Sequence, residues 1–298
     1  MNDRLQQLAL FVRTVETGSF SRAAREFGLT QPSASRAIAA LEERLGVKLI
    51  ARTTRQISAT DAGQKLLPRA REALAAIEDA ENAARGADRL SGVLRVALPT
   101  TYGSRRIAPL LPAFLERHPH LKIDLMMSDR YENLIGEGAE LALRVGEQPD
   151  STFVARKLES ARRLFVAAPS YLARREAPQS LGDLAGHDLI GGGPASLGEQ
   201  SWAAWRNGRT DIAPVEPRVH VRSAAGLAAC AVAGLGIAVA SIWMCAEELA
   251  SGALTEVLTD YALDPITAFV VFPAGRLPSQ KARVFANYLE QAVTQSRT

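Results

Sequence analysis

The chain has 298 residues, of which 47% are hydrophobic, 22% are charged and two are cysteine. This length suits two or three domains, and the hydrophobic fraction excludes a chain that is disordered throughout. Cys230 and Cys245 are too few to hold a fold of this size together, so a disulfide-built secreted scaffold is excluded as well.

The net charge of +3 is small, but the positive charge is concentrated near the N-terminus. Residues 1–60 contain nine Lys or Arg and five Asp or Glu, whereas the two signs nearly balance in the rest of the chain. Such a local excess indicates a polyanionic partner for this segment and for no other part of the chain.

Neither a signal peptide nor a membrane span is expected. Residues 1–7 mix polar and charged side chains, so we expect no secretion and a cytoplasmic location. Residues 223–246 carry no charge and are numerous enough to cross a bilayer of about 30 Å. Gly234 and Gly236 interrupt this run, and the piece after them is typical of a core strand, so a buried helix, a turn and a strand are predicted instead.

The first 46 residues predict three short helices. Apolar residues at the spacing i, i+3, i+4 and i+7 indicate a helix over residues 8–15, and a second is expected over about 21–27. Gly28 ends the second helix, because glycine readily adopts the positive φ of a tight turn. Thr30 is a good cap for a third helix over residues 31–45. Two short helices joined by a glycine-containing turn form a helix-turn-helix.

The third helix has the composition of a helix that reads DNA bases. In a helix-turn-helix the second helix enters the major groove and contacts bases through its N-terminal side chains. Gln can pair with adenine, Arg with guanine, and Ser can reach a base or a phosphate. The polar residues in this position are Gln31, Ser33, Ser35 and Arg36, whereas the side facing the other helices carries Ala34, Ile38 and Leu41.

A hairpin wing is predicted next. Residues 47–52 and 57–60 are two short β-prone pieces around a polar, basic tip. Arg52 and Arg55 would lie near the DNA backbone or the minor groove. The alternative is a helical core with solvated charges, but the wing, the localised charge and the polar set on the third helix together favour DNA binding.

The same residues resemble the DNA-binding domain of LysR-type transcriptional regulators. The resemblance covers about 45 positions at fixed spacing and is carried by Gly18-Ser19-Phe20-Ser21-x-Ala23-Ala24-x-x-x-Gly28-Leu29-Thr30-Gln31-Pro32-Ser33-x-Ser35-Arg36-x-Ile38-x-x-Leu41-Glu42 and by Arg52-Thr53-x-Arg55-x-x-x-x-Thr60-x-Ala62-Gly63. Together with the analysis of the third helix and the wing, the resemblance predicts which residues contact DNA: Gln31, Pro32, Ser33, Ser35, Arg36, Arg52, Thr53 and Arg55.

The resemblance implies an α/β architecture in three parts. Residues 1–60 would form a winged helix-turn-helix, residues 61–90 a linker helix for dimerisation, and residues 91–298 a two-lobed effector domain shaped like a periplasmic binding protein. Lobe I would comprise about 91–162 and 267–298, and lobe II about 163–266. The implied partners are double-stranded promoter DNA, a small-molecule effector and further copies of the chain, as a homodimer or homotetramer.

The linker segment repeats apolar residues every seven positions. Leu67, Leu74 and Glu81 form one series, and Ala70, Ile77 and Ala84 form the other. This is the pattern of two paired helices with one polar interruption. A single amphipathic helix packed on its own chain fits the pattern as well, but the family resemblance favours the dimer.

From residue 93 onward, short apolar runs alternate with helical stretches. This alternation predicts βαβ units and mostly parallel sheets. The expected strands are residues 93–98, 123–127, 141–145, 164–168, 219–221, 237–240 and 268–272. In such folds, ligands bind beyond the carboxyl ends of the strands, near the N-termini of helices.

Five polar residues occupy such positions and are the candidate effector-binding set. Thr100 and Thr101 follow the first strand and open a helix, where hydroxyl groups and free N–H groups converge. Ser128 follows the second strand, and Arg144 ends the third and could pair with a carboxylate. Ser223 opens a helix in the second lobe. Together they indicate an anionic or polar small molecule, and family members bind effectors at similar places between their lobes.

Further stretches, such as Ser128-Asp129-Arg130 and Ala168-Pro169-Ser170-Tyr171-Leu172, are similar to a large subgroup of the family. The chain departs from the family where Glu140 stands for a frequent Asp and where Ala240-Ser241 stand for a Leu-Pro pair. The second departure lies near the hinge and affects the expected geometry of the cleft.

The sequence offers no pattern for catalysis or for a cofactor. Its four histidines lack the spacing of a metal site, and neither G-x-S-x-G nor a P-loop occurs. We therefore expect no enzyme, no metal and no cofactor, and we expect both cysteines to be buried apolar residues. The other hypotheses are a nonspecific DNA binder that oligomerises through its C-terminal half, and a solute-binding protein or enzyme built on the same C-terminal architecture.

Overall fold

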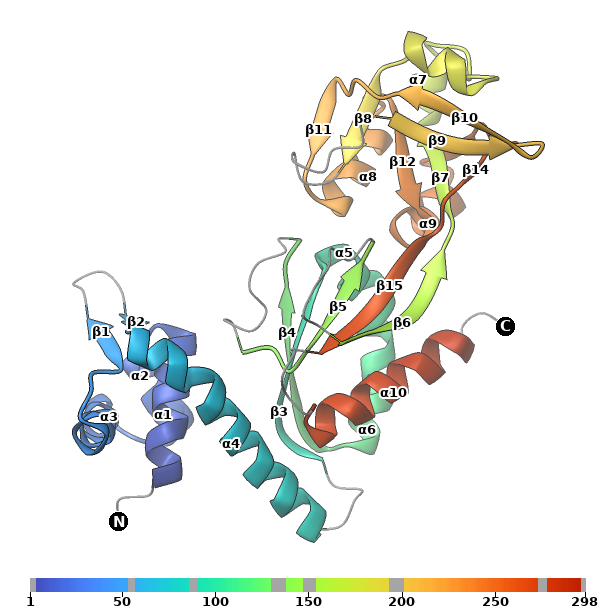
Figure 1. Cartoon of the computed structure of the whole chain (residues 1–298). Helices are drawn as coiled ribbons and strands as arrows, with labels where there is room; N and C mark the ends of the chain where they lie inside the picture. Colours follow the sequence, from blue (N-terminus) through green and yellow to red (C-terminus); the bar gives the residue numbers. More distant parts are fainter. Residues whose placement is uncertain are drawn as a thin grey trace.

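The computed structural model describes residues 4–52, 57–85, 90–129, 138–146, 154–192, 201–272 and 278–295. A small helical unit comes first, a long helix follows, and two α/β lobes complete the chain (Figure 1). Thr53 and Arg55, which were expected at the tip of the wing, lie outside the described residues.

Three helices form the core of the N-terminal unit, as predicted: α1 (Arg4–Thr17), α2 (Phe20–Glu26) and α3 (Gln31–Leu45). Ser19 is the N-cap of α2, and its side chain accepts a hydrogen bond from the N–H of Arg22. Gly28 has a φ of +64°, so the turn before α3 depends on its freedom in the left-handed region.

A buried carboxylate joins the third helix to the wing. The wing strands β1 (Ile50–Arg52) and β2 (Ile57–Ala59) pair antiparallel, as predicted. Glu42 of α3 is only 8% exposed and accepts hydrogen bonds from the N–H groups of Leu49 (2.9 Å) and Ile50 (3.2 Å). Lys48 pairs with its other oxygen at 2.7 Å. The backbone entering the wing is therefore held by one side chain of α3.

The linker helix α4 (Asp61–Arg85) packs against this unit at its N-terminal end. A Cβ at Gly63 would lie 2.1 Å from the carbonyl oxygen of Leu49, so only glycine permits this close approach. Leu67 and Ala70 are 8% and 2% exposed within the core of their own chain. The prediction that both belong to a seam between two chains is therefore wrong for this half of the helix, where they complete the helix-turn-helix core.

The C-terminal part consists of two lobes, each built on a five-stranded sheet. The first sheet has the order β4-β3-β5-β15-β6 and the second the order β11-β8-β12-β7-β13. The strands of the first are β3 (Ser91–Leu98), β4 (His120–Met127), β5 (Leu141–Val145), β6 (Val154–Ala161) and β15 (Ile266–Phe272). Those of the second are β7 (Arg163–Ala167), β8 (Leu189–Gly192), β11 (Val219–Val221), β12 (Ile237–Ser241) and β13 (Thr255–Val257).

Both sheets are mixed, which corrects the expectation of mostly parallel pairing. In the first, β3 pairs parallel with β4 and β5, whereas β15 pairs antiparallel with β5 and β6. The second follows the same plan, with parallel pairs around β8 and antiparallel pairs around β7. The antiparallel strands include β6, β7 and β15. These strands lie next to the places where the chain passes from one lobe to the other, and this passage sets the direction in which they run.

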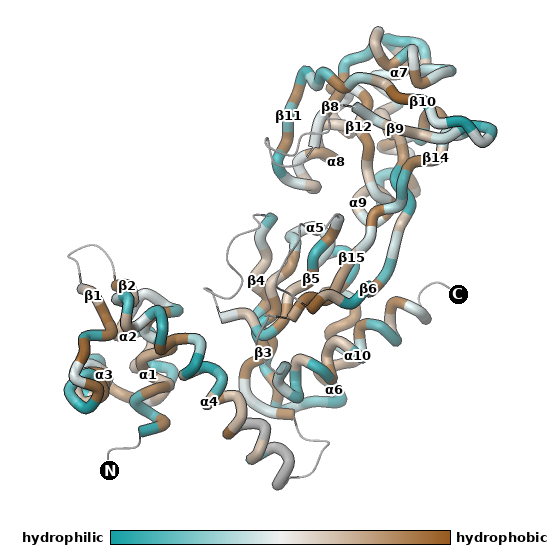
Figure 2. The backbone as a smooth tube through the Cα atoms, viewed as in Figure 1, coloured by the Kyte–Doolittle hydropathy of each residue, from teal (hydrophilic) through white to brown (hydrophobic). Residues whose placement is uncertain are grey.

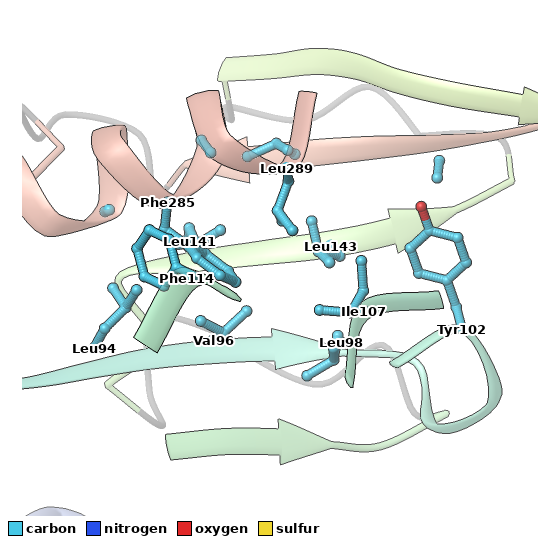
Figure 3. Close-up of a cluster of buried hydrophobic side chains, with 14 of the residues drawn as sticks. Leu94, Val96, Leu98, Tyr102, Ile107, Phe114, Leu141, Leu143, Phe285 and Leu289 are labelled. Carbon is cyan, nitrogen blue, oxygen red and sulfur yellow. The ribbon is translucent and has the colours of Figure 1, made fainter. Parts of the chain in front are cut away.

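A dense apolar cluster fills the first lobe between its sheet and its helices (Figure 3). Leu94, Val96 and Leu141 of the sheet are fully buried against Phe114 of α6 (Leu111–Arg117) and Phe285 of α10 (Gln280–Gln295). The two phenyl rings pack edge to face with their centroids 5.0 Å apart, a geometry that the ring quadrupole favours. Hydrophobic and hydrophilic residues alternate along α10 (Figure 2), which is typical of a helix with one buried face.

The chain from β3 to α6 is helical but irregular. It consists of α5 (Thr100–Tyr102), the π-helical turn η1 (Gly103–Ile107), the 3-10 turn η2 (Ala108–Leu110) and α6. Pro109 and Pro112 lie in this stretch and lack the N–H that a regular helix would use.

The second lobe contains features that the sequence did not reveal. A separate three-stranded sheet has the order β10-β9-β14 and is built from β9 (Ser201–Arg206), β10 (Arg209–Pro214) and β14 (Ala262–Leu263). Two short helical segments, α7 (Pro169–Leu172) and η3 (Leu181–Gly186), lie between β7 and β8.

The uncharged run forms α8 (Ala224–Val232), a turn and β12, as predicted, and α9 (Ile242–Ala250) follows. Among the described residues, no helix combines the length and the apolar character needed to cross a membrane.

We predict that Glu42→Ala destabilises the N-terminal unit by about 1–3 kcal/mol, because the buried N–H groups of Leu49 and Ile50 lose their acceptor. Hydrogen exchange of these two amides in the full chain measures the loss. The control is Glu72→Ala, which removes an exposed ion pair with Arg69 and should cost less than about 1 kcal/mol.

The same interaction predicts a pH dependence. Burial acts to raise the pKa of Glu42, but the hydrogen bonds from Lys48, Leu49 and Ile50 outweigh it and hold the pKa below its usual value. The stabilisation is therefore fully present above the ordinary glutamate pKa of about 4.3 and is lost as the pH falls through the folded-state value. Equal protection of Leu49 and Ile50 on both sides of this range, after correction for intrinsic rates, would contradict the assignment.

Candidate DNA-binding surface and effector site

The third helix separates a buried apolar face from an exposed polar one. Ala34, Ile38 and Leu41 are at most 1% exposed and lie in the core with α1 and α2. Gln31, Pro32 and Arg36 are exposed at the N-terminal end of α3, and Ser33 and Ser35 are half-buried beside them. The structure thus places together all five residues of α3 that were expected to contact DNA.

Polar contacts order these side chains. The hydroxyl groups of Thr30 and Ser33 lie 2.9 Å apart, and Thr30 also caps the helix by accepting from the N–H of Ser33. The guanidinium of Arg36 donates to the Ser33 hydroxyl at 3.5 Å. Ser21 of α2 donates to the side chain of Gln31 at 3.2 Å. The N-terminal end of α3 is therefore a connected set of donors and acceptors.

Positive charge surrounds this end of the molecule. Arg22 and Arg25 are exposed on α2, and Lys48 is exposed before the wing. Sequence reasoning counted Arg22 and Arg25 in the charge excess but gave them no role, although their i, i+3 spacing on the first helix of the motif was a signal. Arg52 ends strand β1, so its backbone belongs to the wing as expected.

One arginine of α1 makes ion pairs within the chain. Arg13 of α1 pairs with Glu26 at 2.5 Å and also with Glu16. The hydrogen bond with Glu26 is the main reason that the pKa of Arg13 is raised, and burial opposes it. Arg71 of α4 binds the second oxygen of Glu16 at 3.0 Å. These ion pairs fix the linker helix to the helix-turn-helix.

In the first lobe, four of the expected effector residues gather at one edge of the sheet. The strands β4, β3 and β5 are neighbours and run parallel, so their carboxyl ends meet there. Thr100 and Thr101 follow β3, Ser128 follows β4 and Arg144 lies near the end of β5. Ser128 donates its N–H to the carbonyl of Leu98, which joins two of these strand ends directly.

One backbone donor at this edge already has a carboxylate partner. The N–H of Thr100 donates to Oδ1 of Asp129 at 2.8 Å. Pro99, the residue before the helix, supplies no side-chain cap, so Asp129 from the next strand end takes that role. Asp129 was not among the expected site residues, and its place after β4 was the available signal. An anionic ligand at this donor would have to displace Asp129.

Thr101 holds a polar group without a partner. The residue is only 7% exposed, and its hydroxyl has no hydrogen-bond partner among the described residues. A buried hydroxyl in this state costs free energy unless a ligand or water satisfies it.

The fifth expected residue lies in the second lobe. Ser223 caps α8, since its hydroxyl accepts from the N–H of Gly226 at 3.1 Å. The short helix α5, which begins at Thr100, lies close to α8. Residues from both lobes therefore approach one another where α5 lies beside α8.

Within the part of the chain that the structure describes, no three His, Cys, Asp or Glu residues are grouped to hold a metal ion. Cys245 is buried and Cys230 half-buried. Burial raises the pKa of the Cys245 thiol to about 11, so its reactive thiolate is scarce at neutral pH.

Comparison with known proteins gives the family. The pattern described as "Bacterial regulatory helix-turn-helix protein, lysR family" matches residues 5–64, and that of the "LysR substrate binding domain" matches residues 87–294. The HTH-type transcriptional regulator CrgA of Neisseria meningitidis serogroup C is 35% identical over 292 residues, which are 97% of either chain.

Solved structures agree with this match. The structure of CrgA from Neisseria meningitidis superposes with a TM-score of 0.62 at 33% identity and covers 96% of this chain and 97% of that one. The Vibrio cholerae virulence activator AphB, described as a member of the LTTR family, has a TM-score of 0.58 at 27% identity and covers 96% and 98%.

The chain belongs to the LysR family of transcriptional regulators, with a helix-turn-helix and a substrate-binding domain.

We predict that Thr101→Val leaves the free protein as stable as the wild type or stabilises it by up to about 2 kcal/mol, because an unsatisfied buried hydroxyl is replaced by a methyl group of similar size. Thermal unfolding of the full chain measures the change. Thr294→Val, which removes a hydroxyl bonded to the carbonyl of Glu290, is the matched control and should not stabilise the protein. A loss of more than 1 kcal/mol in Thr101→Val would mean that the hydroxyl has a partner.

Proposed function

We propose that this chain is a sequence-specific transcriptional regulator whose DNA binding is controlled by a small molecule bound between the two lobes. The proposal rests on the separation of α3 into a buried apolar face and an exposed polar face. Its apolar face is buried, whereas Gln31, Pro32 and Arg36 are exposed at the end that a helix-turn-helix inserts into the major groove. Ser33 and Ser35 complete the set.

The flanking residues supply charge for the DNA backbone. Arg22 and Arg25 lie on the helix that crosses the backbone in this motif, and Arg52, Thr53 and Arg55 belong to the wing segment. Such contacts set affinity and orientation, whereas the side chains on α3 would select the sequence.

A dimer would use the distal half of α4. Leu67 and Ala70 serve the core of their own chain, but Ala73, Ala76 and Ala80 further along the helix are exposed. Small residues allow two helices to approach closely, and two copies would place two α3 helices on one DNA duplex. The family favours a homodimer or a homotetramer built from two dimers.

The effector proposal rests on the edge of the first sheet. Thr100, Thr101, Ser128 and Arg144 meet there, and Ser223 opens the facing helix of the second lobe. The unpartnered hydroxyl of Thr101 and the Arg144 guanidinium suit a ligand with polar oxygen atoms. Asp129, which already accepts from the Thr100 N–H, favours a ligand that presents a hydroxyl or amide donor to this carboxylate over one that presents a second carboxylate.

The first test concerns base reading. We predict that Arg36→Ala weakens binding by about 1–3 kcal/mol at one base position of a selected DNA site and relaxes specificity there. Arg25→Ala should weaken binding to all sequences alike, as expected for a phosphate contact. Selection of sites from random DNA, followed by titration at a fixed salt concentration, provides both measurements. An equal loss on every sequence for Arg36→Ala would point to the nonspecific DNA binder.

The second test concerns the effector. We expect thermal-shift screening of the full chain against small carboxylates, aromatic acids and their amides to give a stabilising compound whose effect is lost in Thr100→Ala or Arg144→Ala. Arg209→Ala, at the exposed turn between β9 and β10, is the control and should keep the shift. A compound that is indifferent to both site variants would place the binding site elsewhere, and its chemical conversion would indicate an enzyme.

A further inference from the structure

Helix α9 of the second lobe extends into the first lobe at the crossing of the chain. The N–H of Ile242 donates to the carbonyl of Arg162, which lies between β6 and β7 where the chain changes lobes. The next residue, Trp243, is 9% exposed and belongs to the apolar cluster of the first lobe. Its ring packs edge to face on that of Tyr102, with centroids 5.0 Å apart. Figure 1 shows α9 beside the strands that join the lobes.

An ion pair connects the lobes one turn further along α9. The guanidinium of Arg105, from the π-helical turn η1 of the first lobe, donates to both carboxylate oxygens of Glu248 at 2.8 and 2.6 Å. The same guanidinium donates to the carbonyl of Met244. The side chains of Arg105 and Glu248 are 26% and 18% exposed, so water screens the pair only in part. A forked, two-point contact of this kind fixes direction as well as distance.

The turn that carries Arg105 is anchored on its other side as well. Arg106 pairs with Glu159 at 3.1 Å, and the hydroxyl of Tyr102 donates to the same carboxylate at 2.6 Å. Glu159 is 2% exposed and lies in β6, the strand that leads to the crossing. The turn η1 is therefore held between the crossing strand and α9.

The position of this turn links it to the proposed effector residues. A π-helical turn is rare and frequently marks a functional site. Here it follows directly after Thr100 and Thr101, so a displacement of these two residues passes along a short helical path to Arg105.

We propose that Arg105 and Glu248 form an interlobe latch, which sets the spacing of the two lobes and transmits a change at Thr100 and Thr101 to α9. That Thr100 and Thr101 contact an effector rests on the function proposed above, whereas the latch itself does not. The contacts of Tyr102, Arg106, Glu159 and Trp243 hold η1 and α9, the two segments that carry this pair.

Hydrogen exchange of the full chain, without DNA or ligand, tests the latch. In Glu248→Gln we expect exchange to accelerate in both η1 and α9 by at least about tenfold, the factor that corresponds to about 1.4 kcal/mol. Because the two segments belong to different lobes, a merely local weakening of α9 would leave η1 unchanged. Either no acceleration or acceleration confined to α9 would overturn the proposal.

Two further variants complete the experiment. Glu290→Gln removes the ion pair between Arg156 and Glu290, which lies within the first lobe, and should leave η1 and α9 as in the wild type. The exchange of charges in Arg105→Glu/Glu248→Arg should restore at least part of the lost protection, and a double variant as fast as Glu248→Gln would count against a direct pair. Since the measurement needs no effector, its failure is distinct from a failure of the effector assignment.

Discussion

The chain passes between its two lobes around residues 162 and 264, and the architecture of the effector domain depends on this double crossing. Strand β6 leads out of the first lobe and β15 leads back into it, so the two strands run in opposite directions where they pair in the first sheet. Strand β7, which enters the second lobe, likewise pairs antiparallel there. Arg163 donates to the carbonyl of Asp264 at 2.9 Å, which holds the two crossing segments together. Each lobe has apolar clusters of its own, although Trp243 of α9 joins the cluster of the first lobe, and a few contacts near the crossing set the relative position of the lobes.

In the N-terminal unit the constraint is different, because a very small core has to hold the polar end of α3 at the surface. Burying Glu42 is acceptable because its oxygens accept hydrogen bonds from two backbone N–H groups and from Lys48, so the carboxylate satisfies donors that would otherwise lack a partner. The linker helix adds Leu67 and Ala70 to the same core. Sharing these residues makes α4 part of the DNA-binding unit, and a change in the direction of α4 would move α3 with it.

In the proposed mechanism, the lobes and the DNA-binding units change their relative positions when a ligand binds and keep their internal structures. A molecule at Thr100 and Thr101 would bias the spacing of the lobes, and the spacing would in turn bias how two DNA-binding units are placed on a duplex. This is coupling between two sites through a two-state element, in which each ligand acts by its different affinity for the two states. The comparison with CrgA and AphB supports the shared architecture of both halves.

The amino-acid sequence by itself determined the local elements of the N-terminal unit. Caps, glycine turns and apolar spacing act over a few residues, so α1, α2, α3 and the wing were predictable, as were the family and most strands of the first lobe. The uncharged run likewise resolved into α8 and β12 because Gly234 and Gly236 separate the two.

Only the tertiary structure decided which partners these elements take. The heptad series of the linker helix could not show that Leu67 and Ala70 pack on their own chain, because an apolar repeat is the same whichever surface covers it. The polar strand β6 is held in the sheet by pairing with β15, more than 100 residues away, and carries no strong β signal of its own. Asp129 at the N–H of Thr100 and Arg105 at Glu248 likewise join residues far apart in the chain, and such pairs arise from the packing of whole elements and not from local spacing.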